Sequence, residues 1–284
     1  MKLNLGCGWD HRPGWTNVDF LAEHEPDVLA DVLQLPFEDG TASYALAQDV
    51  LEHLPRTSTV DALKEWARVL SDEGILELRV PSLFHAVELM KLNSTVSFHE
   101  MLIQNLYGTQ AYTGDIHLTS FTDLTLIHYL HLNGFTRVTA EIKDDWMFDI
   151  KAQKNPSLPK TAIVLSKGIY SEEQNQDEKW RWIAANERVK IINNTEELRL
   201  VNISFQPRHP YDKQAKIIIM VNGQRYTPAL NQDFSLLIKV ATGWTEINFE
   251  TNSTQIKEES TRDLRLMLKN FEISEVGETR KSNS

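Results

Sequence analysis

Two motifs near the start of the chain have the composition of a nucleoside site. Gly6 and Gly8 directly follow an apolar stretch, so the backbone there can approach a ligand without interference from a Cβ atom. Asp19 lies eleven residues after Gly8, and a carboxylate at the end of a strand is a suitable acceptor for ribose hydroxyls. These three residues predict a nucleoside site, and the alternative is a tight turn between two core strands.

The spacing of the two motifs indicates which kind of nucleoside binds. A dinucleotide site requires a third glycine that opens a helix, and its acidic residue follows about twenty residues later. Here the third glycine is missing, no Lys- or Arg-rich loop follows, and Asp19 comes early. We therefore expect a ligand without phosphates.

These residues must be positioned by a sheet, and the first part of the chain alternates strand and helix signals. Apolar residues at helical spacing predict a helix over 60–70 with Ser58 as its N-cap, and a second helix over 124–132 that ends at Gly134. A less regular helical stretch is expected from residue 81 to about 112. Such a series predicts an α/β fold with a largely parallel sheet covered by helices. Strands are predicted at residues 2–5, 18–19, 28–30, 44–48, 75–80, 135–142 and 147–154.

The second part of the chain predicts a different architecture. Two prolines within residues 155–159 make this stretch the best linker candidate. Beyond it, short strand-like runs follow one another without helices, which is typical of a β-sandwich. Asn222-Gly223 between two runs is a strong hairpin signal. We expect a domain over 1–157, a C-terminal all-β sandwich over 158–276 and a disordered tail over 277–284. The strands are predicted at residues 189–192, 198–205, 216–221, 226–227, 234–240, 246–250 and 264–273.

Charge and composition limit the partners. Residues 1–160 contain 12 Lys and Arg against 23 Asp and Glu, a net charge of −11, whereas the rest contains 17 of each. An acidic surface repels phosphates, so nucleic acid is not an expected partner. The 284 residues include one cysteine, Cys7, which a small buried side chain explains, and no apolar run is long enough to span a membrane. We expect a soluble cytoplasmic protein.

Five motifs in one order resemble class I S-adenosylmethionine-dependent methyltransferases. The resemblance covers roughly the first 155 residues and is closest to the compact type-11-like group found beside bacterial glycan-assembly enzymes. It implies a Rossmann-like sheet with an antiparallel edge pair, S-adenosylmethionine as cofactor, and glycan-assembly enzymes as partners. The motifs are residues 3–8 (Leu-Asn-Leu-Gly-Cys-Gly), 14–19 (Gly-Trp-Thr-Asn-Val-Asp), 31–37 (Asp-Val-Leu-Gln-Leu-Pro-Phe), 49–54 (Asp-Val-Leu-Glu-His-Leu) and 68–70 (Arg-Val-Leu).

The resemblance also implies the cofactor contacts. The alternative for the acidic residues among them is an ordinary loop acid or helix cap. The implied contacts are Gly6 and Gly8 beside the methionine moiety, Asp19 on the ribose hydroxyls, and Asp31 with the backbone of Val32 and Leu33 at the adenine amino group.

The acceptor side is implied by the same resemblance. Asp49 is expected to face the amino-acid part of the cofactor or the acceptor. His53 either lines the cofactor pocket or packs on the sheet. Residues 81–119 are expected to cover the cofactor, and within them His117 can accept the proton of a sugar hydroxyl, with Asp115 as a residue that orients it. The alternative for His117 is a hydrogen bond to a neighbouring backbone group.

Other conspicuous side chains receive plainer interpretations. His128 and His131 have a spacing compatible with metal binding, but no other ligand run supports them, and we expect no metal site. Trp180, Trp182 and Trp244 form either a sugar-stacking platform or, as is more common, part of a sandwich core.

The sequence therefore predicts an S-adenosylmethionine-dependent methyltransferase that acts on a hydroxyl of a sugar or glycan precursor. The glycan acceptor is argued only by association. A C- or N-methyltransferase of a small aromatic or quinone acceptor is an alternative, because the same motifs serve such enzymes. A further alternative is a glycan-binding or scaffold protein that retains the fold without turnover.

Overall fold

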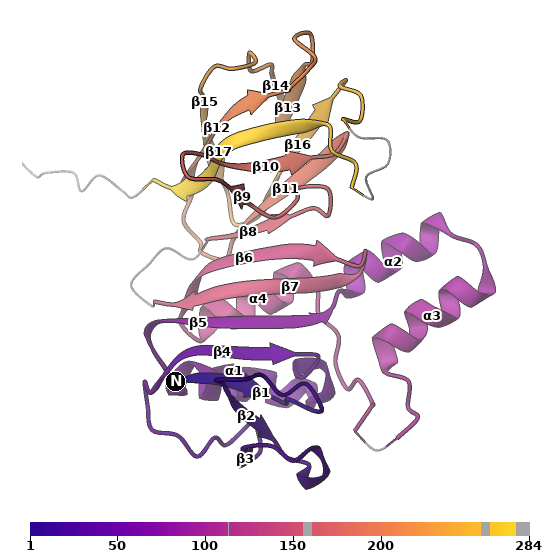
Figure 1. Ribbon diagram of the computed structural model, residues 1–284, viewed down its shortest axis with the longest axis vertical. Coiled ribbons are helices and arrows are strands. Elements are labelled where there is room, and N and C mark those ends of the chain that lie inside the picture. The colour runs from indigo at the N-terminus through magenta and orange to yellow at the C-terminus, as the bar shows by residue number, and fades with distance from the viewer. Residues whose placement is uncertain (113, 156–160, 257–261, 277–284) are drawn as a thin grey trace, which may run out of the picture. The chain divides into compact units, whose positions relative to one another are not determined.

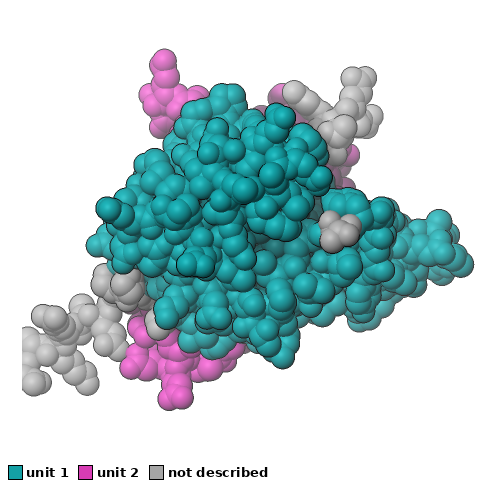
Figure 2. Space-filling view, turned by 90° about the horizontal axis from the view of Figure 1, so that it is seen from below, with its two compact units in different colours: residues 1–162 teal, residues 163–284 magenta. Residues whose placement is uncertain are grey.

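A computed structural model describes residues 1–112, 114–155, 161–256 and 262–276 (Figure 1). The chain divides into two compact units, unit 1 over residues 1–162 and unit 2 over residues 163–284 (Figure 2). The predicted tail and, apart from Asn155, the predicted linker lie outside the described residues. None of the helices described has the length and hydrophobicity that a membrane crossing requires.

The sheet of unit 1 is mostly parallel. Its strands lie in the order β3, β2, β1, β4, β5, β7, β6. The first five are parallel to one another, and β7 runs antiparallel to both β5 and β6. The predicted α/β fold with an antiparallel final pair is therefore confirmed. The strands are β1 (Lys2–Leu5), β2 (Thr16–Asp19), β3 (Val28–Leu29), β4 (Ala42–Gln48), β5 (Leu70–Pro81), β6 (Phe135–Lys143) and β7 (Met147–Lys154).

Helices α1 (Thr59–Val69) and α4 (Asp123–Leu132) lie side by side behind this sheet (Figure 1). Their apolar faces are buried, and Trp66 of α1 is completely enclosed. Thr122 caps α4 by accepting a hydrogen bond from the N–H of Thr125, and Gly134 (φ +84°) follows its end as expected. Ser58 occupies the N-cap position of α1 as predicted, but it also ends the short 3₁₀ helix η3 (Arg56–Ser58), and its side chain makes no capping bond.

The stretch from residue 81 to 112 forms two helices, where a single irregular one was expected. They are α2 (Leu83–Leu92) and α3 (Val96–Tyr107), and they share a small apolar cluster around Leu102. The chain bends between the two helices at Asn93. Its side-chain Oδ1 accepts a hydrogen bond from the N–H of Thr95 (2.9 Å), which competes with continuation of the helix. Two further 3₁₀ helices, η1 (Ala22–His24) and η2 (Leu51–His53), follow β2 and β4.

Unit 2 contains two antiparallel sheets that share one apolar core. The strands β14, β13, β16 and β11 follow one another in that order within one sheet, and the second sheet has the order β15, β12, β17, β10, β9. Burial alternates along β12 and β13, so every second side chain points inward. The strands are β9 (Glu173–Gln174), β10 (Lys179–Ile183), β11 (Asn186–Asn193), β12 (Arg199–Arg208), β13 (Ile217–Val221), β14 (Gln224–Tyr226), β15 (Phe234–Val240), β16 (Gly243–Thr251) and β17 (Leu266–Glu275), while β8 (Thr161–Leu165) begins in unit 1 and continues into unit 2.

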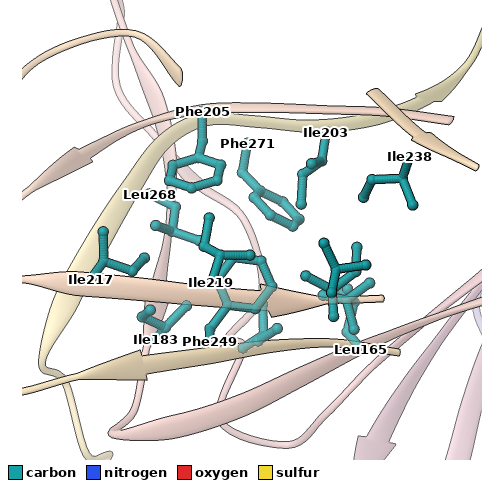
Figure 3. Close-up of a cluster of buried hydrophobic side chains, with 14 of the residues drawn as sticks. Leu165, Ile183, Ile203, Phe205, Ile217, Ile219, Ile238, Phe249, Leu268 and Phe271 are labelled. Atoms are coloured by element: carbon teal, nitrogen blue, oxygen red, sulfur yellow. The ribbon is translucent and has the colours of Figure 1, made fainter. Parts of the chain in front are cut away.

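Side chains from both sheets fill the space between them (Figure 3). Ile219 and Phe249 come from one sheet, and Ile203, Phe205 and Phe271 come from the other, all at most 8% exposed. Aromatic rings meet at centroid distances of 6.1 Å (Phe205 with Phe249) and 6.3 Å (Phe205 with Phe271). This core explains why the strand-like runs of the second half carry large apolar residues at every second position.

Two local expectations in unit 2 have opposite outcomes. The Asn222-Gly223 hairpin is confirmed, because both residues have positive φ angles (51° and 74°) and connect β13 to β14. The core interpretation of Trp244 is wrong, since its side chain is 56% exposed. Alternation along β16 turns Trp244 outward, where the ammonium group of Lys190 lies 5.4 Å from the ring centroid.

Candidate active site

The candidate site lies at the edge of the unit 1 sheet where the parallel strands β1 to β4 end. The chain leaves these strands at Gly6, Phe20, Ala30 and Asp49, so all four segments emerge on the same side. The strand order also reverses direction here, because β2 and β3 lie to one side of β1 and β4 lies to the other. Open α/β sheets bind ligands in the crevice outside such a reversal point.

The glycine turn is shaped by its own backbone and by β4. Gly6 (φ +61°) and Gly8 (φ +51°) both have left-handed conformations, and the N–H of Cys7 donates to the carbonyl oxygen of Val18 (3.0 Å). A Cβ atom on Gly6 would lie 2.6 Å from Cγ2 of Val50. Gly6 therefore lets the segment after β4 pack directly against the turn.

Asp19 is fixed by one contact to this turn and one to the segment that follows β2. Its Oδ2 accepts a hydrogen bond from the N–H of Gly8 (2.8 Å), and its Oδ1 accepts one from the N–H of Leu21 (2.9 Å). Nδ1 of His24 lies 3.2 Å from Oδ1, without hydrogen-bond geometry. The residue is 4% exposed. The structure thus brings together Gly6, Gly8 and Asp19 as the sequence predicted.

A polar network holds the short loop between β1 and β2, which has no room for a helix. Oδ1 of Asn17 accepts from Nδ2 of Asn4 (3.0 Å) and from the N–H of Arg12 (2.9 Å). Nδ2 of Asn4 also donates to the carbonyl oxygen of Asp10 (2.7 Å). Asp27 accepts from the backbone and side chain of Asn17, both at 2.8 Å, and these bonds lower the pKa of Asp27. The sequence analysis missed this support.

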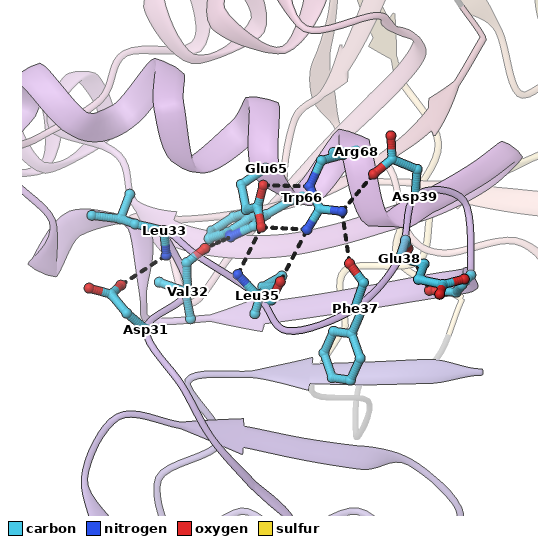
Figure 4. Close-up of polar contacts among 11 residues, drawn as sticks. Asp31, Val32, Leu33, Leu35, Phe37, Glu38, Asp39, Glu65, Trp66 and Arg68 are labelled. Carbon is cyan, nitrogen blue, oxygen red and sulfur yellow. Dashed lines mark hydrogen bonds and ion pairs between the residues drawn. The ribbon is translucent and has the colours of Figure 1, made fainter.

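The segment after β3 forms a loop that is docked on α1 (Figure 4). The exposed Asp31 caps its own turn, since its Oδ1 accepts from the N–H of Leu33 (2.8 Å). The indole N–H of Trp66 donates to the carbonyl oxygen of Val32 (3.0 Å). The three residues predicted at the adenine therefore share one turn, whose backbone is anchored to the buried face of α1.

Arg68 and Glu65 of α1 hold the continuation of this loop (Figure 4). Nη2 of Arg68 donates to the carbonyl oxygen of Leu35 (3.1 Å), and Nη1 donates to that of Phe37 (2.8 Å). Glu65 accepts from Arg68 at 2.7 and 2.8 Å and from the N–H of Leu35 (2.8 Å). Nη1 of Arg68 also forms an ion pair with Oδ1 of the exposed Asp39 (2.7 Å). The guanidinium group thus ties three points of the loop to one helix.

Asp49 begins the next part of the site with an unusual backbone. Its φ angle is +55°, and its N–H donates to the carbonyl oxygen of Arg79 (3.0 Å). The guanidinium of Arg79 binds both oxygens of the Asp49 carboxylate, with Nε at 3.1 Å from Oδ1. This bidentate pair orients Asp49 at the end of β4.

His117 is brought to η2 by the segment that follows α3. The N–H of Leu118 donates to the carbonyl oxygen of Glu52 (2.8 Å), and the N–H of His117 donates to that of Tyr107 (3.1 Å). Gly108 is required at the start of the segment, because a Cβ there would collide with the backbone of Asp115. The expected orientation of His117 by Asp115 is wrong as a direct contact, since the carboxylate of Asp115 accepts from Thr109.

A third residue, which the sequence analysis did not single out, completes the group around His117. Glu52 is 1% exposed, and burial, with a smaller contribution from the nearby Asp49, raises the pKa of its carboxyl to about 8. The rings of His53 and His117 meet edge to face with centroids 4.7 Å apart. Burial, together with His53, lowers the pKa of His117. Glu52, His53 and His117 each offer one ligand atom, and these atoms all lie within 4.8 Å of one another.

The comparisons with known proteins support one kind of chemistry for this edge. Residues 13–78, which include Asp19, the loop after β3, Asp49 and α1, match the model of a methyltransferase domain family. Unit 1 contains an S-adenosylmethionine-dependent methyltransferase domain. Its cofactor is S-adenosylmethionine. No curated protein matches the chain.

Solved structures align with 54% of the chain. One is described as a possible exported protein from Bordetella parapertussis (13% identity, TM-score 0.41), of which 61% is covered. Another is a S-adenosylmethionine-dependent methyltransferase from Thermotoga maritima, possibly a histamine N-methyltransferase (15% identity, TM-score 0.39, 82% covered). A third is 1,6-didemethyltoxoflavin-N1-methyltransferase from Burkholderia thailandensis with bound S-adenosylhomocysteine (15% identity, TM-score 0.38, 70% covered).

The sequence contained a signal for some of what was missed. Glu52 stands directly before His53 in the motif at residues 49–54, so a carboxyl beside a site histidine could have been considered. The burial of Glu52 could not be predicted from the sequence, because it depends on contacts between residues 116–119 and η2. Asn17 and Asp27 are ordinary polar residues in sequence, and only the pairing of β2 with β1 and β3 makes them a network.

Proposed function

We propose that the protein transfers a methyl group from S-adenosylmethionine to a hydroxyl of a sugar or glycan precursor. The proposed cofactor contacts follow the order of the strand ends. The acceptor is proposed to lie beside Asp49 and His117. The cofactor residues of this proposal are Gly6, Gly8, Asp19, Asp31, Val32, Leu33, Asp49 and His53.

The observation that carries the cofactor site is the fixed carboxylate of Asp19 beside the glycine turn. Both of its oxygens already accept one backbone N–H, from Gly8 and Leu21, so the carboxylate is held in one orientation before any ligand binds. Each oxygen retains lone-pair capacity, which suits a pair of ribose hydroxyls. Preorganisation of this kind reduces the entropy lost when the cofactor binds.

A hydroxyl acceptor is supported by the state of His117. Methyl transfer from a sulfonium is an in-line displacement, and a hydroxyl that attacks must lose its proton. The lowered pKa of His117 favours a neutral ring near pH 7. Its Nδ1 is buried and accepts no hydrogen bond from any described residue. A neutral nitrogen of this kind is suited to receive the proton.

Unit 2 is proposed to be an independent β-sandwich domain that contacts the glycan. The two antiparallel sheets around one core support the sandwich. The exposed Trp244, with Lys190 beside it, offers an aromatic face to a pyranose. The glycan itself rests on the resemblance of residues 1–155 to enzymes found beside glycan-assembly enzymes, and a cytoplasmic location would give access to nucleotide-activated sugars.

The cofactor site is tested first, by calorimetric titration with S-adenosylmethionine and S-adenosylhomocysteine and with NAD as a control. We expect micromolar binding of the first two and none of NAD. Asp19→Ala should weaken S-adenosylhomocysteine at least tenfold, with a melting curve to verify that the variant is folded. Tight binding by a folded Asp19→Ala variant would contradict the ribose assignment.

The acceptor is tested by following formation of S-adenosylhomocysteine with nucleotide sugars and with phenolic acceptors. We expect turnover with a nucleotide sugar that is lost in His117→Ala and retained in His128→Ala, a matched change on the exposed side of α4. Turnover with phenolic acceptors alone would favour the aromatic alternative. Cofactor binding without turnover on any glycan fraction would favour the scaffold alternative.

A further inference from the structure

Glu52 and His53 face a common space with His117, which lies more than sixty residues later in the sequence. The ligand atoms of the three side chains all lie within 4.8 Å of one another. Glu52 and His53 belong to η2, and His117 is held beside them through the bond from the N–H of Leu118 to the carbonyl oxygen of Glu52. No metal site was predicted from the sequence, because only histidines at helical spacing were considered as ligands. The group of Glu52, His53 and His117 is assembled by tertiary contacts.

We propose that Glu52, His53 and His117 bind one divalent transition-metal ion, and that its open coordination position receives the acceptor hydroxyl. The inference rests on the proposed function for the hydroxyl acceptor, and it replaces His117 as the proton acceptor by the ion and water. The ion site itself stands on the geometry of the three side chains.

Glu52 provides the first argument for an ion. The residue is 1% exposed, yet neither carboxyl oxygen has a hydrogen-bond partner in the described part of the chain. Buried carboxyl groups are normally hydrogen-bonded, paired with a cation or coordinated to a metal. No lysine or arginine side chain pairs with Glu52 among the ion pairs of the described residues, since the nearest guanidinium, that of Arg79, binds Asp49. A bound cation would supply the missing partner.

The two histidines provide the second argument, because the ring of His53 is fixed by a backbone carbonyl and the ring of His117 has a buried nitrogen without a partner among the described residues. Nδ1 of His53 lies 3.3 Å from the carbonyl oxygen of Ile116, which can only accept, so His53 carries its proton on Nδ1. Nδ1 of His117 is buried and has no hydrogen-bond partner within the residues described, so it is available to bind an ion. A backbone bond of the kind that fixes His53 is typical of metal-binding histidines.

The donor set and its exposure indicate the class of ion. Two imidazoles and one carboxylate suit Zn²⁺, Fe²⁺ or Mn²⁺ better than Mg²⁺ or Ca²⁺, which prefer oxygen ligands alone. Bonds of about 2.1 Å place tetrahedral ligand atoms about 3.4 Å apart, so closure from 4.8 Å needs side-chain shifts of about 1 Å. His53 and His117 are only half-buried, which gives the ion and the acceptor a route from solvent.

The ion would change the path of the proton. A coordinated hydroxyl loses its proton to water more easily because the positive charge lowers its pKa. The oxygen then forms the bond to the methyl carbon while the bond from that carbon to sulfur breaks, and the sulfonium keeps the electron pair and becomes a neutral thioether. His117 would be a ligand in this scheme and not the base, so the two roles exclude each other.

The test measures ion binding directly on the full chain after removal of metals with EDTA. Zn²⁺ and Mn²⁺ are titrated by calorimetry, and the bound metal is counted by mass spectrometry after dialysis. We expect one ion per chain, with affinity reduced at least about 100-fold in Glu52→Gln and His117→Ala and unchanged in His128→Ala. Co²⁺ bound in place of Zn²⁺ should show visible bands of a nitrogen-ligated site that are lost in His117→Ala.

Each outcome has a defined meaning. Binding of S-adenosylhomocysteine is measured in parallel, and its retention by Glu52→Gln shows that this variant is folded. If S-adenosylhomocysteine binds but the wild-type chain retains no ion, the metal site is refuted while the cofactor site stands. An ion that all variants bind equally is adventitious and also refutes it. If the ion binds but S-adenosylhomocysteine does not, the proposed function fails and the ion site remains.

Discussion

Arg68 offers a sensitive test of how the predicted adenine loop is held. Arg68→Ala removes the donors to the carbonyl oxygens of Leu35 and Phe37 (3.1 and 2.8 Å) and the paired bonds to Glu65. Each bond to a carbonyl contributes about 1 kcal/mol. The partly exposed pair with Glu65 contributes about 1 kcal/mol, and the pair with the 80% exposed Asp39 is given no value. The free energy of unfolding should fall by about 3 kcal/mol.

This loss has two measurable consequences. For a unit of this size, about 3 kcal/mol lowers the melting temperature by about 6–12 °C. The loop over 31–39 includes the proposed adenine contacts, so its loosening should weaken S-adenosylhomocysteine about tenfold. Thermal unfolding and calorimetric titration measure the two effects on the same samples.

Arg68→Lys is the matched control, because lysine keeps the charge but cannot reach two carbonyls and a carboxylate with one planar fork. We expect an intermediate loss of stability. A melting temperature of Arg68→Ala within about 1 °C of the wild type would refute the idea that Arg68 holds the loop.

Three further predictions follow from single contacts. Gly6→Ala should destabilise the protein more than Gly8→Ala in urea unfolding, because both need left-handed backbone but only Gly6 has Val50 2.6 Å from the added Cβ; equal losses would contradict this. Burial, with Asp19 nearby, raises the pKa of Cys7 from 9.0 to about 11, so iodoacetamide should label the native thiol slowly at pH 8. Since the unfolded thiol ionises first, this group's contribution to stability should fall between pH 9 and 11, a slope that Cys7→Ala should lack. Phe249→Ala should cost about 3–5 kcal/mol in chemical unfolding, and a loss below about 1 kcal/mol would mean that the core of unit 2 is not packed as described.

The order of strands and helices in unit 1 was predictable because the residue pattern of each segment favours the same structure that the sheet pairing requires. Residues 2–5 alternate in a way that fits a strand, and the glycines that follow mark the point where the chain must turn. The helix over 59–69 was predicted within one residue at each end, since its apolar residues share one face. Ser58 is its N-cap as predicted, but the side-chain capping bond is absent because Ser58 also belongs to a preceding 3₁₀ turn, which depends on how residues 51–58 pack.

In unit 2, the alternation of apolar and polar residues predicted where the strands lie in the sequence, but not always which face of the sheet a side chain occupies. Large apolar residues at every second position of β12 and β13 identify strands, and the structure buries that set. The core interpretation of Trp244 rested on the fact that tryptophans in such domains are more often core than sugar-stacking, whereas Thr245 and Ile247 occupy the inward positions of the strand. In a strand, a shift of one residue turns a side chain to the opposite face.

The sequence by itself indicated the candidate cofactor residues at the strand ends. Glycines at a turn and an acid such as Asp19 at a strand end are recognisable from residue type and spacing alone, because a nucleoside site requires both. The sequence also determined the class of cofactor through the motifs that these residues form. Only the tertiary structure decided which side chains meet beyond them. Glu52 is buried next to His117 because a segment more than sixty residues later returns to η2, and no local pattern encodes such a contact. The group of Glu52, His53 and His117, which the proposals place on the acceptor side, is therefore a product of folding.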